Sequence, residues 1–117
     1  MNQVGLTYNR PWGSYRTVEM TDNYQIKHIS VDAGKRLSLQ RHTHRSEHWT
    51  IIEGAGVVQL GGDLVNVSVN SQIYIPKTVL HRVTNTGLKA LKFIEVQIGD
   101  YLGEDDIERV EDDFGRT

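Results

Sequence analysis

The sequence contains no cysteine, and this removes several classes of protein from consideration. Without thiols the chain cannot be a disulfide scaffold, carry an iron–sulfur cluster, bind zinc through thiolates or use a cysteine nucleophile. It also lacks an apolar run of membrane-spanning length, and its first residues lack the basic and apolar regions of a signal peptide. We therefore expect a cytoplasmic protein with no membrane partner.

Basic runs are missing as well, and the formal net charge is −2. Before Asp100 there are 11 Lys/Arg and 7 Asp/Glu, whereas from Asp100 onwards there are 2 and 8. Because no lysine-rich segment accompanies the mildly positive body, we expect no nucleic-acid partner, and an anionic small molecule suits it better. Residues 100–117 are interpreted as a solvated acidic tail, with at most one helical turn near residues 105–110.

Helical periodicity is absent before this tail. Instead, short runs rich in β-branched and aromatic residues alternate with turn signals. One example is Gly61-Gly62-Asp63 between the runs at 57–60 and 64–69. This pattern is typical of an all-β sandwich or barrel. At 117 residues the chain suits a single domain, 1–117, with a jelly-roll barrel at 9–99 and the tail at 100–117.

The most informative stretch is residues 34–56, which concentrates metal-ligand side chains in a protein with five histidines. Nine residues contain Gln40, His42, His44, Glu47 and His48. Because residues two apart on a strand point to the same side, we expect Gln40, His42 and His44 to project together. An isolated His-x-His pair is often two ordinary surface histidines, but the density of ligand types here favours a metal site.

One strand cannot surround a metal, so further ligands must come from elsewhere. A tight turn at Arg45-Ser46 would bring either Glu47 or His48 into the site, and His81 would arrive from a distant strand. Extending the even phase of the strand favours His48, whereas a break of phase at the turn favours Glu47. Imidazole and carboxylate ligands suit a divalent metal, with zinc preferred and manganese, cobalt, nickel or iron as alternatives.

The pattern Gly34…His42-Thr43-His44…Glu47…Gly54 resembles the first motif of the cupin superfamily, whose fold is a double-stranded β-helix. Counting back from Gly54 by that motif favours Glu47 over His48 as the ligand. The segment at residues 76–85, which contains His81, resembles the second motif. The second motif has glycine where this sequence has Thr78, and its leading glycine would stand at Asn70. In the first motif, the gap from Gly34 to His42 is longer than in cupins generally and the gap from His44 to Glu47 is shorter.

A narrower resemblance covers the chain from Arg10 to its end. Matching segments occur in type II phosphomannose isomerases, at residues 10–15, 37–42, 44–49, 74–76, 95–97, 101–107 and 112–116. In that family the cupin usually follows a mannose-1-phosphate guanylyltransferase half, and this sequence lacks such a half. The resemblance therefore implies a stand-alone mannose-6-phosphate isomerase without nucleotidyl transfer. The segment at residues 37–42 also resembles type I isomerases, where a Gln-x-His pair binds zinc. This resemblance implies that Gln40 is a ligand.

An aldose–ketose isomerase needs an electrophile for the developing oxyanion, a base near the sugar carbon and cations for the phosphate. We expect Glu95 to be the base, with His48 as the alternative, and Arg82 to assist catalysis. Arginine suits phosphate because its fork matches the oxygens. The expected substrate-binding residues are Arg45, Lys77 and Arg36, and Arg41 is a further candidate.

Three other functions use the same fold. They are an Fe(II) oxygenase, a metal-free sugar-nucleotide epimerase with a His–Asp pair, and a non-catalytic sugar-binding or regulatory cupin. The density of ligand residues argues against the epimerase. By analogy with other paired β-sandwiches, we expect a homodimer that binds a small sugar phosphate.

Overall fold

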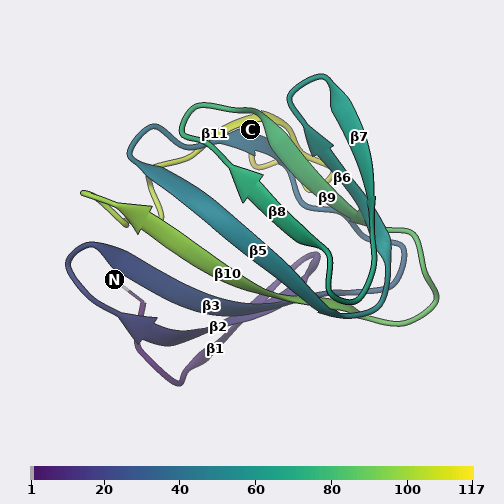
Figure 1. Ribbon diagram of the computed structural model, residues 1–117, viewed down its shortest axis with the longest axis horizontal. Coiled ribbons are helices and arrows are strands. Elements are labelled where there is room, and N and C mark those ends of the chain that lie inside the picture. The colour runs from purple at the N-terminus through teal and green to yellow at the C-terminus, as the bar shows by residue number, and fades with distance from the viewer. Residues whose placement is uncertain (1) are drawn as a thin grey trace.

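Two antiparallel sheets pack face to face in a computed structural model that describes residues 2–117 (Figure 1). Met1, the first residue of the predicted domain, lies outside the described residues. The six-stranded sheet has the order β1-β2-β3-β10-β5-β8, and the five-stranded sheet has the order β11-β4-β9-β6-β7. The prediction of an all-β barrel is confirmed. No helix within residues 2–117 is long and apolar enough to cross a membrane.

The strands are short and follow the alternation of the sequence. Their bounds are β1 Thr7–Arg10, β2 Gly13–Met20, β3 Tyr24–Val31, β4 Leu39–Arg41, β5 Arg45–Glu53, β6 Gly56–Leu60, β7 Asp63–Val67, β8 Gln72–Ile75, β9 His81–Asn85, β10 Leu91–Gly99 and β11 Glu108–Glu111.

The inner faces of both sheets form one apolar core at one end of the barrel. On β10, Leu91 and Phe93 are fully buried, and Phe93 stacks on Trp49 of β5 with the ring centroids 4.5 Å apart. Along the same strands the buried positions then become polar, at Glu47 on β5 and at Glu95 and Gln97 on β10. The barrel therefore has an apolar end and a polar interior end, and the polar end holds the candidate ligands.

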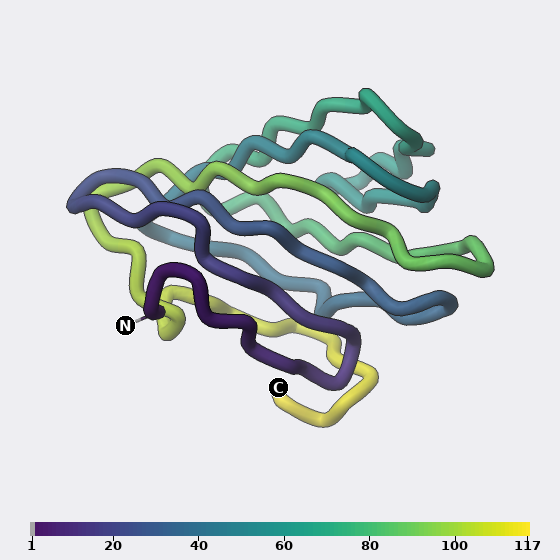
Figure 2. The backbone as a smooth tube through the Cα atoms, turned by 90° about the horizontal axis from the view of Figure 1, so that it is seen from below, coloured from purple at the N-terminus to yellow at the C-terminus, as the bar shows by residue number. Residues whose placement is uncertain are grey.

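The acidic C-terminal segment is not a solvated tail, and this part of the prediction is wrong. Residues Glu108–Glu111 form β11, which pairs with β4 and extends the five-stranded sheet. Figure 2 shows this segment, in yellow, returning along the barrel to lie beside the N-terminal segment in purple, where Asn2 donates a hydrogen bond to Glu104. Three of its carboxylates, those of Glu108, Glu111 and Asp113, pair with arginines of the barrel, and these ion pairs support the strand pairing.

Candidate metal centre

Three of the predicted ligands converge inside the barrel. His42 lies just after β4, Glu47 lies on β5 and His81 begins β9, and one ligand atom from each lies within 4.8 Å of the others. All three side chains are buried. Strand pairing sets this geometry, because Gln40 of β4 lies opposite His81 of β9.

His44 does not join them, although we expected it to share a face with His42. The chain bends at Thr43-His44, and both backbone N–H groups donate to the Asp106 carboxylate, at 3.0 and 2.9 Å. The bend ends the alternation two residues earlier than the turn we expected at Arg45-Ser46. As a result the imidazole of His44 is exposed, and its Nδ1 lies 3.7 Å from Asp100.

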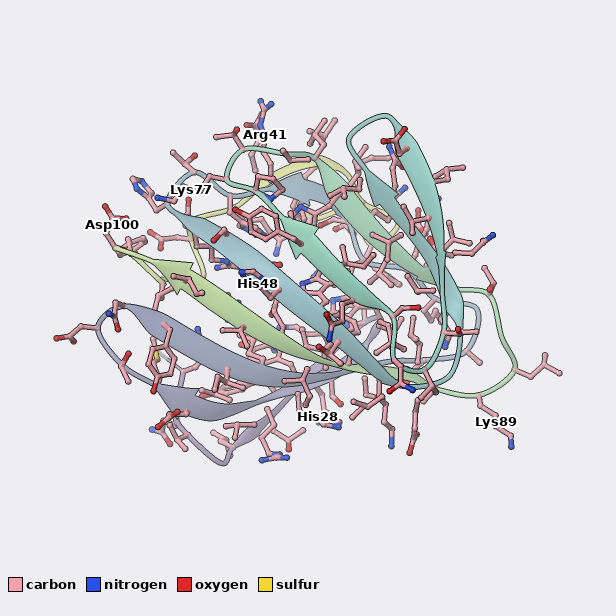
Figure 3. All side chains as sticks on the ribbon, viewed as in Figure 1. His28, Arg41, His48, Lys77, Lys89 and Asp100 are labelled. Carbon is pink, nitrogen blue, oxygen red and sulfur yellow. The ribbon has the colours of Figure 1, made fainter. Side chains whose placement is uncertain are left out.

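The bend also decides between Glu47 and His48. Strand β5 resumes at Arg45, and its odd-numbered residues face inward, so Glu47 is buried whereas His48 is exposed. The imidazole of His48 packs on Tyr74 of β8 on the outer face, with the ring centroids 4.8 Å apart. Figure 3 shows His48 on the strand that faces the viewer, and this places it outside the barrel as neither ligand nor base.

The two buried imidazoles are oriented as metal ligands require. Nδ1 of His42 donates to the carbonyl of Asp106 at 2.7 Å, and Nδ1 of His81 donates to the carbonyl of Val79 at 3.0 Å. Each Nε2 is thereby left with a lone pair facing Glu47, at 3.3 Å from His42 and 3.8 Å from His81. Backbone acceptors of this kind fix the tautomer of metal-binding histidines.

Burial keeps both imidazoles neutral. Desolvation, assisted by the Arg45 charge, lowers the pKa of His42 to about 4, and burial also lowers the pKa of His81. Among residues 2–117, Nε2 of His81 has no hydrogen-bond partner although it is buried. An unpaired buried polar atom is costly, and a metal ion would satisfy it. The residues present therefore fit a divalent metal.

Gln40 is placed to complete the set. Its amide lies against His42, with Nε2 3.3 Å from the imidazole Nε2, while its Oε1 accepts a hydrogen bond from Ser38 at 2.6 Å. Rotating the amide by half a turn would present the oxygen to the same point. The two amide orientations differ only in their hydrogen-bond partners, so a bound cation would favour the oxygen.

Arg45 is the one predicted substrate-binding residue that reaches the centre. Its guanidinium is buried, and Nε donates to Glu47 Oε2 at 2.9 Å. Nη2 lies 3.4 Å from Nε2 of His42, and Nη1 is buried without a hydrogen-bond partner in the described part of the chain. Burial opposes ionisation of Glu47, but the hydrogen bonds to its carboxylate and the fixed positive charge of Arg45 outweigh burial and lower its pKa.

Glu95 lies beside Glu47, as a second carboxyl group in the interior. The indole N–H of Trp49 is shared between Glu47 Oε1 at 3.0 Å and Glu95 Oε1 at 3.2 Å, and Gln97 donates to Glu95 Oε2. Burial and the neighbouring Glu47 charge raise the pKa of Glu95 to about 8. Two carboxyl groups with opposed pKa shifts allow one to remain charged while the other exchanges a proton.

Gln40, Arg45 and Glu95 line a cavity of about 140 Å³, whereas His42, Glu47 and His81 are not among its lining residues. It is lined by Arg10, Trp12, Tyr15, Lys27, Ile29, Leu37, Gln40, Arg45, Trp49, Phe93, Glu95, Glu104, Ile107, Arg109 and Arg116. Sequence reasoning did not assign Arg10, Lys27, Arg109 or Arg116 to the site. Arg10 and Arg116 lie in the family-matching segments at 10–15 and 112–116, and that match is the sequence signal that could have identified these two residues.

The other predicted cations lie elsewhere. Arg36 binds Asp113 through two hydrogen bonds, at 2.7 and 2.8 Å. Arg82 is buried and donates to the carbonyl of Leu37 and to Glu111. The expectation that these two arginines bind substrate or assist catalysis is wrong, because they face the C-terminal segment and hold it on the barrel.

Lys77 and Arg41 also lie away from the cavity. Lys77 is exposed on the loop after β8, and Arg41 forms a surface ion pair with Glu108 at 2.8 Å. In Figure 3 both side chains project from the outer margin of the molecule.

Comparison of the sequence with known families gives a match to the family described as "Mannose-6-phosphate isomerase C-terminal" over residues 2–112. The alginate biosynthesis protein AlgA of Pseudomonas aeruginosa is 51% identical over 108 residues, which are 92% of this chain and 22% of that protein. A mannose-1-phosphate guanylyltransferase of Escherichia coli is 44% identical over 108 residues, again 92% of this chain and 23% of that protein.

Solved structures support the fold. KdgF from a Halomonas species aligns with a TM-score of 0.77 and 16% identity, covering 85% of this chain and 90% of that one. A mutant of the Bacillus subtilis oxalate decarboxylase aligns with a TM-score of 0.80 and 16% identity, covering 90% of this chain and 30% of that one. At this identity the likeness concerns the fold alone. A Klebsiella pneumoniae protein described by its double-stranded β-helix domain aligns with a TM-score of 0.73.

The sequence relatives correct one prediction. This chain spans less than a quarter of the length of AlgA and of the guanylyltransferase. The prediction of a stand-alone isomerase is therefore wrong, because these relatives contain the domain as a fragment of longer biosynthetic proteins. The match over residues 2–112 shows that the chain belongs to the mannose-6-phosphate isomerase C-terminal family, and its fold is that of a double-stranded β-helix.

Proposed function

We propose that this domain catalyses the metal-dependent isomerisation of mannose 6-phosphate to fructose 6-phosphate. The observation that carries the proposal is the buried convergence of His42, Glu47 and His81. Gln40 and Arg45, which contact His42 and Glu47, line a cavity that also contains further basic side chains. The family match over residues 2–112 supports the same assignment. On this proposal, the domain would be the isomerising part of a longer biosynthetic protein.

We assign the metal to Gln40, His42, Glu47 and His81, a mixed nitrogen and oxygen set that suits zinc and its neighbours in the first transition series. A divalent metal bound there would supply a Lewis acid for the sugar oxygens. The chain keeps the ligands ready through backbone acceptors on both Nδ1 atoms and through Arg45, which holds Glu47 in its charged form.

Glu95 is assigned as the group that moves the proton between C2 and C1 of the open-chain sugar. It lines the cavity, and Trp49 and Gln97 fix both of its carboxyl oxygens. A pKa of about 8 lies near the working pH of most cytoplasmic enzymes, and a group there both accepts and returns a proton readily. Arg45 Nη1, which is free of protein partners in residues 2–117, is available to a sugar oxygen.

The test is to load the domain separately with zinc, manganese, cobalt and nickel and to incubate it with mannose 6-phosphate. Fructose 6-phosphate should appear, and in D₂O solvent deuterium should enter C1 of the ketose. Absence of product with all four metals would refute the isomerase. Dioxygen consumption by the iron-loaded protein without isomerisation would identify the oxygenase alternative instead.

A further inference from the structure

Five basic side chains line the cavity, and their charges are not balanced equally. They are Arg10, Lys27, Arg45, Arg109 and Arg116. Three of them have a carboxylate within ion-pair distance, in the pairs Lys27–Glu104, Arg45–Glu47 and Arg116–Asp112. Within residues 2–117, Arg10 and Arg109 have no such partner. The cavity therefore carries two uncompensated guanidinium groups.

Arg109 is the more confined of the two. It lies on β11 and is half-buried, and its buried Nε has no hydrogen-bond partner anywhere in the described chain. Burial and the nearby charge of Arg116 lower the pKa of Arg109. A half-buried guanidinium next to two other arginines is unfavourable on its own, and a bound anion would reverse the sign of that interaction.

Arg10 is held in place at the solvent side of the same cavity. Its guanidinium carbon lies 5.3 Å from the ring centroid of Tyr15 and 5.7 Å from that of Tyr8, and Nη1 donates to the carbonyl of Asn9 at 2.8 Å. The two rings stack on each other, with centroids 5.1 Å apart. Stacking on aromatic faces restricts the side chain and leaves Nη2 with only a long contact, 3.4 Å, to the Tyr15 hydroxyl.

We propose that Arg10 and Arg109, supported by Arg116, form an anion subsite that binds the phosphate group of a sugar phosphate. The proposal rests on the isomerase function and specifies how its substrate lies. The phosphate would occupy the arginine-lined mouth, with the sugar directed inward to Gln40, Arg45 and Glu95, which line the same cavity. Forked guanidinium donors match phosphate oxygens, and a position near solvent lowers the desolvation cost of the dianion.

This placement gives the C-terminal segment a role in recognition. Arg109 and Arg116 both belong to it, and Arg36 and Arg82 hold it on the barrel through Asp113 and Glu111. Phosphorylated sugars would therefore be selected over free sugars by a segment that is remote in sequence from the metal ligands.

The test compares the full 117-residue chain with R10Q/R109Q and with R16Q. Arg16 is the matched control, because it lies on β2 outside this cavity and also lacks a carboxylate partner in the described chain. Calorimetric titration with inorganic phosphate should show affinity reduced more than about tenfold in R10Q/R109Q, since charged hydrogen bonds are lost. The KM for mannose 6-phosphate should rise by about the same factor with kcat changed less than about threefold, and R16Q should match wild type.

Wild-type affinity for phosphate in R10Q/R109Q, or failure of the wild-type chain to bind phosphate, would overturn the subsite. R10Q alone removes only an exposed side chain and keeps the test valid if the double variant does not fold. Phosphate binding that R10Q/R109Q abolishes, in a protein without turnover on any metal, would refute the isomerase and leave the subsite standing. Normal turnover with an unchanged KM in R10Q/R109Q would refute the subsite and leave the isomerase standing.

Discussion

Glu47 and Glu95 share the indole N–H of Trp49 at 3.0 and 3.2 Å, and both carboxyl groups are buried inside the barrel. Arg45 contacts only the first of them directly. The pair is therefore asymmetric. Glu47 keeps its charge and serves as a ligand, whereas the raised pKa of Glu95 leaves it able to take up and release a proton.

Replacing Glu95 with glutamine should separate these roles. E95Q keeps the size of the side chain but cannot transfer a proton, so kcat for mannose 6-phosphate should fall by about 10²- to 10⁴-fold. Metal content, measured by elemental analysis after dialysis, should stay at the wild-type ratio because Glu47 is untouched. Loss of the metal together with activity would show that Glu95 serves the metal site.

The two histidines of the His-x-His pair should behave differently. H42A removes a buried imidazole of the metal centre, and we expect metal affinity to fall by at least about 10-fold with loss of turnover. H44A removes an exposed imidazole two residues away and is the matched control, expected to retain metal and activity. Competition with a chromogenic chelator measures both affinities, and equal losses in the two variants would contradict the assigned centre.

Strand alternation explains what could be predicted of this site and what could not. The residue types on residues 34–56 and at His81 indicated a metal site on a β scaffold, and the alternation correctly placed Gln40 with His42. The bend that turns His44 outward depends on Asp106, which lies 62 residues away in sequence and accepts the His44 N–H. A local pattern contains no information about a partner at that separation, so the sequence alone predicts the phase break at Arg45-Ser46 and not at the observed bend.

The C-terminal segment shows the same limit. Its composition indicated a solvated tail, because eight acidic residues and one short apolar pattern do not predict a strand. The pairing of β11 with β4 depends on Arg36, Arg41 and Arg82, each of which meets an acidic residue of the segment. The sequence alone does not identify these partners, so it suggests Arg36 and Arg41 as substrate-binding candidates and Arg82 as a residue that assists catalysis.

Thr78 and Asn70, the two departures from the cupin glycine pattern, lead to a stability prediction. They are the non-glycine residues of the described chain with positive φ, at 70° and 76°. A β-branched side chain is strained there, so T78G should raise the free energy of unfolding by about 1 kcal/mol. T78A, which keeps a Cβ, is the control and should gain less. Urea denaturation measures the difference, and a destabilised T78G would show that the loop tolerates threonine without strain.

The Lys27–Glu104 pair should contribute pH-dependent stability. Burial opposes ionisation of Glu104, but the Lys27 ammonium and its hydrogen bond outweigh burial and lower the pKa to about 2 from 4.5. A depressed carboxyl pKa stabilises the folded state above pH 4.5, and the contribution is lost as the pH falls towards 2. Wild type should therefore exceed E104Q in unfolding free energy at pH 7, and the gap should close between pH 4.5 and 2. A difference in unfolding free energy between wild type and E104Q that persists at pH 2 would show that packing, and not the charge of Glu104, causes it.

Arg82 should be needed for the C-terminal strand, and not for the chemistry. Its buried guanidinium donates to the carbonyl of Leu37 at 2.9 Å and to Glu111 at 2.8 Å, so R82Q leaves a buried acceptor unpaired and should cost about 1–3 kcal/mol. R36Q breaks an exposed pair with Asp113 and should cost at most about 1 kcal/mol. Hydrogen exchange should show faster opening of Glu108–Glu111 in R82Q, while metal affinity stays at the wild-type level. Weakened metal binding with an intact β11 would instead place Arg82 in the metal site.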